Sequence, residues 1–168
     1  MSESRRTVPI ERVSIVSARS FDDVLADVRA ALGHARDLGA LIARWNAAGR
    51  VEEFDAVAAD VAGHSGLIEF LSLDLGEVLE IRAPQRAYRM VRIIAGNPVT
   101  MSEMAVTVPD VGSYAPISIV VSDRPDGVHL SYDTVSSALA PYDSPDAAAV
   151  AAALDDKVLE LLRHAATG

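Results

Sequence analysis

The sequence contains no cysteine. This excludes disulfide bonds, thiolate nucleophiles, cysteine-ligated zinc and iron–sulfur clusters. Aromatic residues are also few, at 5% of the 168 residues, so valine, leucine and isoleucine must supply most of the core. The same scarcity removes the stacking platforms that single-stranded nucleic-acid-binding proteins use.

Positive charge is scarce as well. The chain has 15 lysine and arginine residues against 24 aspartate and glutamate residues, which gives a formal net charge of −9. Proteins that bind nucleic-acid phosphates need clustered positive charge, so we expect no nucleic-acid partner. Lys157 is the single lysine, a bias that we attribute to genome composition.

Long apolar runs are absent. Nowhere do about 18 uncharged apolar residues follow one another, and the first residues lack the apolar region of a secretory signal. The sequence therefore predicts a cytoplasmic protein without a membrane partner. A chain of this length can bury about 70% of its unfolded surface in one core, so we expect a single domain over residues 1–168.

The N-terminal part of the sequence reads as a strand followed by helices. Residues 10–18 alternate between apolar and polar positions, as a half-buried strand does. Ser20 is suited to cap a helix that runs to residue 32, with Gly33 as its end. Residues 34–66 contain two short, alanine-rich amphipathic patterns, which predict a helical insertion.

The middle of the chain, residues 67–133, has the periodicity of a sheet. Residues 68–73 and 77–81 are expected to form a hairpin with a glycine in its turn. Residues 88–95 are expected to form a further strand, followed by a short helix over residues 98–105.

A second hairpin is predicted from residues 117–122 and 128–132, which flank an Asp-Gly turn. Ser144 and Pro145 then form a typical helix start, and the last helix is expected over residues 145–166. The pattern predicts the α+β class: one domain with an antiparallel sheet of about five to six strands, helices packed on one face, and the helical insertion.

A Gly-Asn-Pro stretch follows the strand of residues 88–95. Asn97 is suited to an N-cap, Pro98 to the first helical turn, and Gly96 gives the turn its freedom. Free N–H groups at a helix start also bind anions. The stretch is therefore either a helix cap alone or a cap that also holds a ligand.

Arg92 shares a strand face with Met90 and Ile94. A charge buried on an apolar face must be paired. One interpretation is a structural ion pair with an acid such as Asp133. The other is an anchor for a carboxylate or phosphate, because a guanidinium group can donate two parallel hydrogen bonds.

Other candidate residues have everyday structural explanations. Tyr132 and Asp133 stand near a strand end, where binding groups often lie. Met101 and Met104 are three residues apart on one helical face, and methionine commonly fills gaps in cores. Packing is the more common role for these side chains.

Two further motifs give weaker signals. The stretch Gly63-His64-Ser65-Gly66 resembles a nucleophile elbow, but Leu67 replaces the final glycine and the order is helix, turn, strand instead of strand, turn, helix. Ser65 is better explained as a turn residue. The four histidines lack the spacing of a metal site, so we predict none, although a site built in three dimensions from His64, His129 and carboxylates stays open. No cofactor motif is present.

The segments YAPISIVVSDRPDGVHLSYD and LAPYDSPDAAAVAAALDDKVLELL, together with the Gly-Asn-Pro stretch, resemble the family called domain of unknown function 302. The resemblance is clear over residues 88–162 and weaker over residues 10–32. It implies an α+β fold similar to the TATA-box-binding-protein class and frequent dimerisation, without implying DNA binding. The long connection over residues 33–66 departs from the family, in which it is short.

Three functions remain open from the sequence. The first is a small-molecule-binding homodimer with a cavity between sheet and helix. Its binding residues would be Arg92, Gly96, Asn97, Met101, Tyr132 and Asp133. The second is an enzyme that uses Asp133 with Tyr132 or His129 as an acid–base pair, with no cofactor identified. The third is a purely structural or protein-interaction module.

Overall fold

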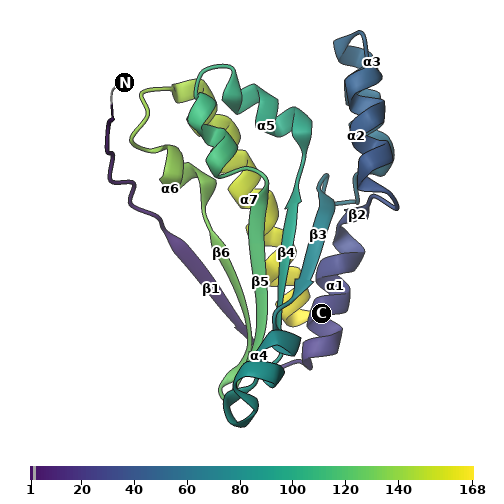
Figure 1. Cartoon of the computed structure of the whole chain (residues 1–168), viewed down its shortest axis with the longest axis vertical. Coiled ribbons are helices and arrows are strands. Elements are labelled where there is room, and N and C mark those ends of the chain that lie inside the picture. Colours follow the sequence, from purple (N-terminus) through teal and green to yellow (C-terminus); the bar gives the residue numbers. More distant parts are fainter. Residues whose placement is uncertain (2) are drawn as a thin grey trace.

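The computed structural model describes residue 1 and residues 3–168, with only the backbone described for Arg86. Within this part of the chain, six strands form one sheet in the order β1-β6-β5-β4-β3-β2 (Figure 1). Neighbouring strands are antiparallel except β2 and β3, which are parallel. The strands are β1 Arg12–Ser17, β2 Gly33–His34, β3 Ile68–Asp74, β4 Met90–Gly96, β5 Ile117–Arg124 and β6 Gly127–Asp133.

Seven α-helices accompany the sheet in the described residues, so the chain is a single α+β domain. Helices α1 and α7 pack against one face of the sheet, and α7 runs behind the strands in the view of Figure 1. Helices α2 and α3 stand apart at one end, and we call residues 38–61 the arm. The helices are α1 Phe21–Ala31, α2 Leu38–Ala47, α3 Val51–Val61, α4 Gly76–Arg82, α5 Pro98–Ala105, α6 Val135–Leu139 and α7 Pro145–Thr167.

The core lies between the sheet and helices α1 and α7. Alternate residues of β4, β5 and β6 are buried there, as the pleat of a strand requires. Alanines on the inner side of α7 let the helix approach the sheet closely. The main members of this cluster are Val24, Val28, Val91, Ile93, Ile119, Val121, Leu130, Ala151, Val158 and Leu162. The opposite face of the sheet, which we call the open face, carries no helix of the described chain.

A polar cluster around Asp155 is buried within this apolar core. The carboxylate of Asp155 accepts a hydrogen bond from the Tyr132 hydroxyl at 2.5 Å, and from the backbone N–H groups of Val135 and Ser136, each at 2.9 Å. Tyr132 and Asp155 are 1% and 5% exposed. A buried carboxylate needs such partners, and these three tie α7 to β6 and to the start of α6.

The base of the arm is a crossing of two backbone segments. A Cβ atom on Gly33 would overlap the carbonyl oxygen of Val61, and one on Gly63 would overlap that of Ala31. The N–H groups of Gly33 and Gly63 both donate to the carbonyl of Leu67, at 2.9 and 3.0 Å. Only glycine permits this approach, so the arm leaves the domain at a fixed place.

The loop next to this crossing confirms that Ser65 is a turn residue. Its hydroxyl donates to the carbonyl of Ala31 at 2.7 Å, and its N–H donates to the same carbonyl at 3.2 Å. The helix-to-strand order around it is also the one that the sequence indicates, which is the wrong order for a nucleophile elbow.

One predicted hairpin is wrong. Residues 77–81 belong to helix α4 and not to a strand, and β3 pairs with β4 instead. The reason is local: the Asp74 carboxylate accepts from the N–H groups of Gly76 and Glu77, at 2.9 and 3.2 Å, and so starts a helix where β3 ends. Strand β2 and helix α6 were not anticipated.

The Tyr132 contact predicts a pH dependence of stability. Burial raises the pKa of Tyr132 above its ordinary value, and the hydrogen bond to Asp155 adds to this. Unfolded Tyr132 loses its proton near pH 10 while the folded residue keeps it, so this contribution is complete below pH 10 and is lost as the pH rises further. We expect the free energy of unfolding to fall by about 1.4 kcal/mol per pH unit above pH 10, as measured by urea denaturation. Tyr132→Phe should remove most of this slope, and an unchanged slope would contradict the assignment.

The glycine crossing gives a second prediction. Gly33→Ala forces a methyl group onto backbone atoms that cannot rotate away, so we expect unfolding to become easier by about 1–3 kcal/mol. Gly112→Ala is the matched control, because a Cβ there meets nothing within 4 Å, and it should stay within about 0.5 kcal/mol of the parent. Equal stabilities of the two variants in urea denaturation would show that the crossing is not tight.

Candidate functional site

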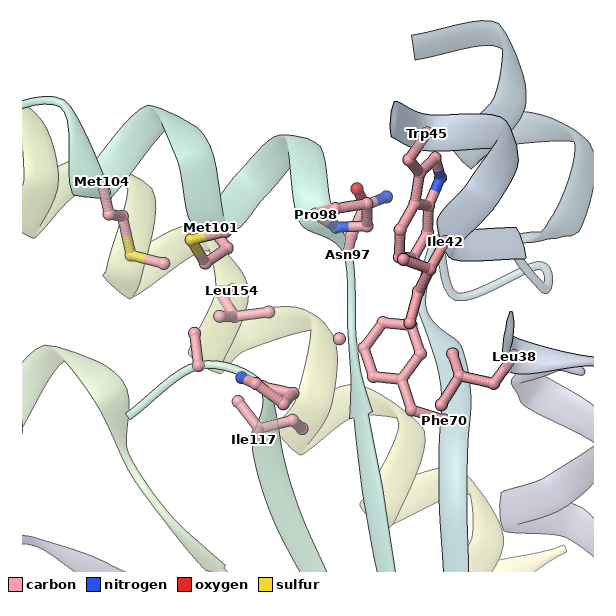
Figure 2. Close-up of a pocket in the computed structure, with 13 residues that line it drawn as sticks. Leu38, Ile42, Trp45, Phe70, Asn97, Pro98, Met101, Met104, Ile117 and Leu154 are labelled. Atoms are coloured by element: carbon pink, nitrogen blue, oxygen red, sulfur yellow. The ribbon is translucent and has the colours of Figure 1, made fainter. Parts of the chain in front are cut away.

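An apolar cavity of about 330 Å³ lies at the end of the sheet, beneath α5 and beside the arm. Figure 2 shows Met101 and Met104 on one side of it and Trp45 with Phe70 on the other. Its walls come from α2, β3, the β4–α5 junction, the start of β5 and α7. The lining residues are Leu38, Ile42, Trp45, Phe70, Gly96, Asn97, Pro98, Met101, Met104, Ala115, Pro116, Ile117 and Leu154.

The arm supplies one wall through α2. Leu38, Ile42 and Trp45 recur at intervals of three and four residues, which places them on one face of the helix. Trp45 packs edge-on against Phe70, with ring centroids 6.1 Å apart and planes at 86°, a favoured aromatic geometry. The indole Nε1 is buried without a hydrogen-bond partner among the described residues, so packing holds the ring.

The opposite wall is the start of α5. The Asn97 Oδ1 atom accepts from the Val99 N–H at 2.9 Å, and its Nδ2 donates to the carbonyl of Gly66 at 2.9 Å. The predicted N-cap is thus confirmed, and both the oxygen and the nitrogen of the side-chain amide have a hydrogen-bond partner. Met104 is fully buried and Met101 partly so, and their thioethers form the roof of the cavity.

Gly96 keeps the cavity open where it meets the open face. A Cβ atom there would lie 3.4 Å from the ring of Phe70 and 3.4 Å from Pro116. These are ordinary contact distances, so a small side chain fits without strain while filling the gap between the two residues. The absence of a side chain at this position therefore determines the space that the cavity offers.

Three of the six residues predicted to bind a ligand line this cavity, namely Gly96, Asn97 and Met101. Tyr132 lies in the core, bound to Asp155. Arg92 and Asp133 line a second hollow of about 240 Å³ on the open face. The structure does not bring the six residues together into one site.

The suggested ion pair between Arg92 and Asp133 does not form. Asp133 is bound by two nitrogens of a different guanidinium, Arg12 Nε and Nη2, at 2.6 and 2.7 Å. Arg92 Nε instead donates to the Ser118 hydroxyl at 2.7 Å. Arg92 is exposed, so the premise of a buried charge that needs a carboxylate partner does not apply.

The groups considered for acid–base chemistry lie apart. Tyr132 and Asp133 are successive residues of β6, so their side chains point to opposite faces of the sheet. The hydrogen bonds from Arg12 lower the pKa of Asp133, which makes it a weaker base, and burial raises the pKa of Tyr132, which makes it a weaker acid. His129 is bound to Asp126 at 2.9 Å in the β5–β6 hairpin.

Sequence reasoning missed the arm side of the cavity. The helical spacing of Ile42 and Trp45 was visible, but their contact with Phe70 depends on where the arm stands. The single tryptophan of a chain so poor in aromatic residues was the one signal that pointed there.

The observed class of protein is an open-faced α+β domain with an apolar cavity at one end of its sheet. The family model described as Domain of unknown function DUF302 matches residues 44–165, and the chain belongs to this family, as the sequence resemblance indicated. The structure resembles the crystal structure of the uncharacterized conserved protein DUF302 from Bacillus stearothermophilus. The TM-score is 0.63 and the identity 11%, over 92% of this chain and 97% of that chain.

This likeness concerns the fold alone. No curated protein matches the chain. Among the described residues, no helix is long and apolar enough to cross a membrane, and no group of three or more histidine, aspartate or glutamate side chains is placed to hold a metal ion.

Proposed function

We propose that this domain binds a small, mostly apolar molecule in the cavity between the arm, α5 and the end of the sheet. The observation that carries the proposal is the lining: apolar side chains from five segments surround a space of about 330 Å³. Ligand sites are typically concave, apolar and formed before the ligand arrives. Since water occupies about 30 Å³ per molecule in the liquid, the cavity has room for roughly ten non-hydrogen atoms.

The lining suits a ligand whose body is uncharged. Asn97 uses its side-chain oxygen and nitrogen for the helix cap and the bond to Gly66. No charged residue lines the cavity within the described chain. An apolar body therefore fits this space better than a charged metabolite, whose desolvation would be uncompensated.

A titration monitored by the fluorescence of Trp45, the single tryptophan, tests this proposal. Octanamide is a suitable neutral probe, and we expect a saturable change in emission. Gly96→Val should weaken the affinity at least tenfold, because its side chain fills the gap between Phe70 and Pro116. Gly112→Val, at a position with open space around its Cβ, should leave the affinity unchanged.

Circular dichroism must first show that both variants are folded. An emission that does not saturate with octanamide would refute the proposed function. The same affinity in the parent and in folded Gly96→Val would place the probe outside the cavity.

We further propose that the domain forms a homodimer through the free edge of β1. Within the described chain no strand pairs with its outer side, and its six residues, Arg12–Ser17, contain no proline or lysine. An edge of this kind is a template for pairing with a second strand. Two copies of β1 side by side would extend the sheet and leave the cavity accessible at its end.

The oligomeric state measured by sedimentation velocity tests this dimer. Ser14→Lys places a charge on the exposed side of β1 and, in a symmetric pairing, brings like charges together. We expect it to convert a dimer into a monomer. Val78→Lys, at an exposed position of α4, is the control and should remain dimeric. A parent protein that sediments as a monomer, or a Ser14→Lys variant that stays dimeric, would contradict this interface.

A further inference from the structure

The hollow of about 240 Å³ on the open face adjoins the apolar cavity. Pro116 and Ile117 line both spaces. The hollow differs in character, because hydroxyl and charged groups form much of its wall. Its polar members are Arg92, Ser113, Tyr114, Ser118, Asp133 and Thr134.

Arg92 is the cation of this hollow. Its Nε donates to the Ser118 hydroxyl at 2.7 Å, and its two Nη groups have no protein partner among the described residues. The neighbouring carboxylate, Asp133, is neutralised by the two hydrogen bonds from Arg12. Arg92 therefore presents a positive charge and free donors in a protein whose net charge is −9.

The register of the sheet shows where the guanidinium points. On β4 and β5, Arg92 is paired with Val120 and Ile94 with Ser118. The hydrogen bond to Ser118 therefore turns the Arg92 side chain along the strand, toward the end of the sheet at which the cavity lies. Ser118 is two residues from Pro116, a distance of about 7 Å at roughly 3.3 Å per strand residue.

We propose that the ligand is an anionic amphiphile whose apolar chain occupies the cavity and whose carboxylate binds Arg92 and Ser118. This inference rests on the proposed function and adds the class of the ligand. The two Nη groups match the geometry of a carboxylate. Because the Ser118 oxygen accepts from Arg92, its own O–H can donate to the same carboxylate.

The neighbouring contacts suit a ligand that bends over the edge of the sheet. Pro116 is exposed and separates the two spaces, so an aliphatic chain would pass over its ring. Gly96 faces Pro116 across the strands without a side chain to obstruct that path. The apolar and polar parts of one molecule would then each meet surroundings of their own kind.

Comparison of octanoate with octanamide tests the inference, because the two have the same length and differ in charge. Binding is measured by isothermal titration calorimetry and Trp45 fluorescence for the parent, Arg92→Gln and Arg124→Gln. Arg124 is the matched control, since its Nε donates to a serine hydroxyl of the same strand, Ser122, at 3.1 Å but lies outside both spaces. Gln is shorter than Arg but keeps a polar side chain that donates hydrogen bonds, while it removes the charge.

We expect the parent to bind octanoate more tightly than octanamide. Arg92→Gln should weaken octanoate binding at least tenfold and change octanamide binding by less than twofold, and Arg124→Gln should change neither. Equal affinities for both probes with no effect of Arg92→Gln would overturn the inference and leave the apolar cavity intact as a binding site. If neither probe binds the folded parent protein, the proposed function fails together with the inference.

Discussion

The backbone contact at the base of the arm determines where the cavity can exist. Gly33 and Gly63 cross so closely that neither tolerates a Cβ atom, and both donate to one carbonyl, that of Leu67. From this point α2 runs past the end of the sheet and lays Trp45 against Phe70. Without that fixed departure point the wall formed by the arm would have no defined position.

A second constraint acts from the opposite side, through Asp155. Its three hydrogen bonds fix the rotation of α7 relative to β6 and α6. Leu154, the preceding residue, then lines the cavity. The buried carboxylate and the glycine crossing are far apart in sequence, yet each positions one wall of the same space. The polar core contact is thus structural, and Tyr132 serves the site by positioning α7.

Much of the fold could be predicted because its signals are local. Caps at Ser20, Asn97 and Ser144 act within one helical turn, and all three are observed. The Asp-Gly turn likewise defines the β5–β6 hairpin. Residues 77–81 were mistaken for a strand because a run of five residues is too short to separate the period of a strand from that of a helix. The group that decides, Asp74, precedes them.

The site was harder to predict because it depends on tertiary placement. Gly96, Asn97 and Met101 line the cavity, and the strand-to-helix junction that holds them is visible in the sequence. Trp45 and Phe70 meet only because the arm folds back beside β3. One of the two interpretations of Arg92 was a buried charge paired with Asp133. Its face of the sheet carries no helix of the described chain, and Arg12 is the residue that binds Asp133. Which face of a sheet receives the helices is decided by the whole chain.

We propose that the space between the arm and α5 is a ligand site. A crystal structure of the protein grown with octanoate tests it most directly. We expect the aliphatic chain between Trp45 and Met101 and the carboxylate beside Arg92. Octanoate bound at any other place, or a cavity closed by side chains in crystals that contain the probe, would contradict it.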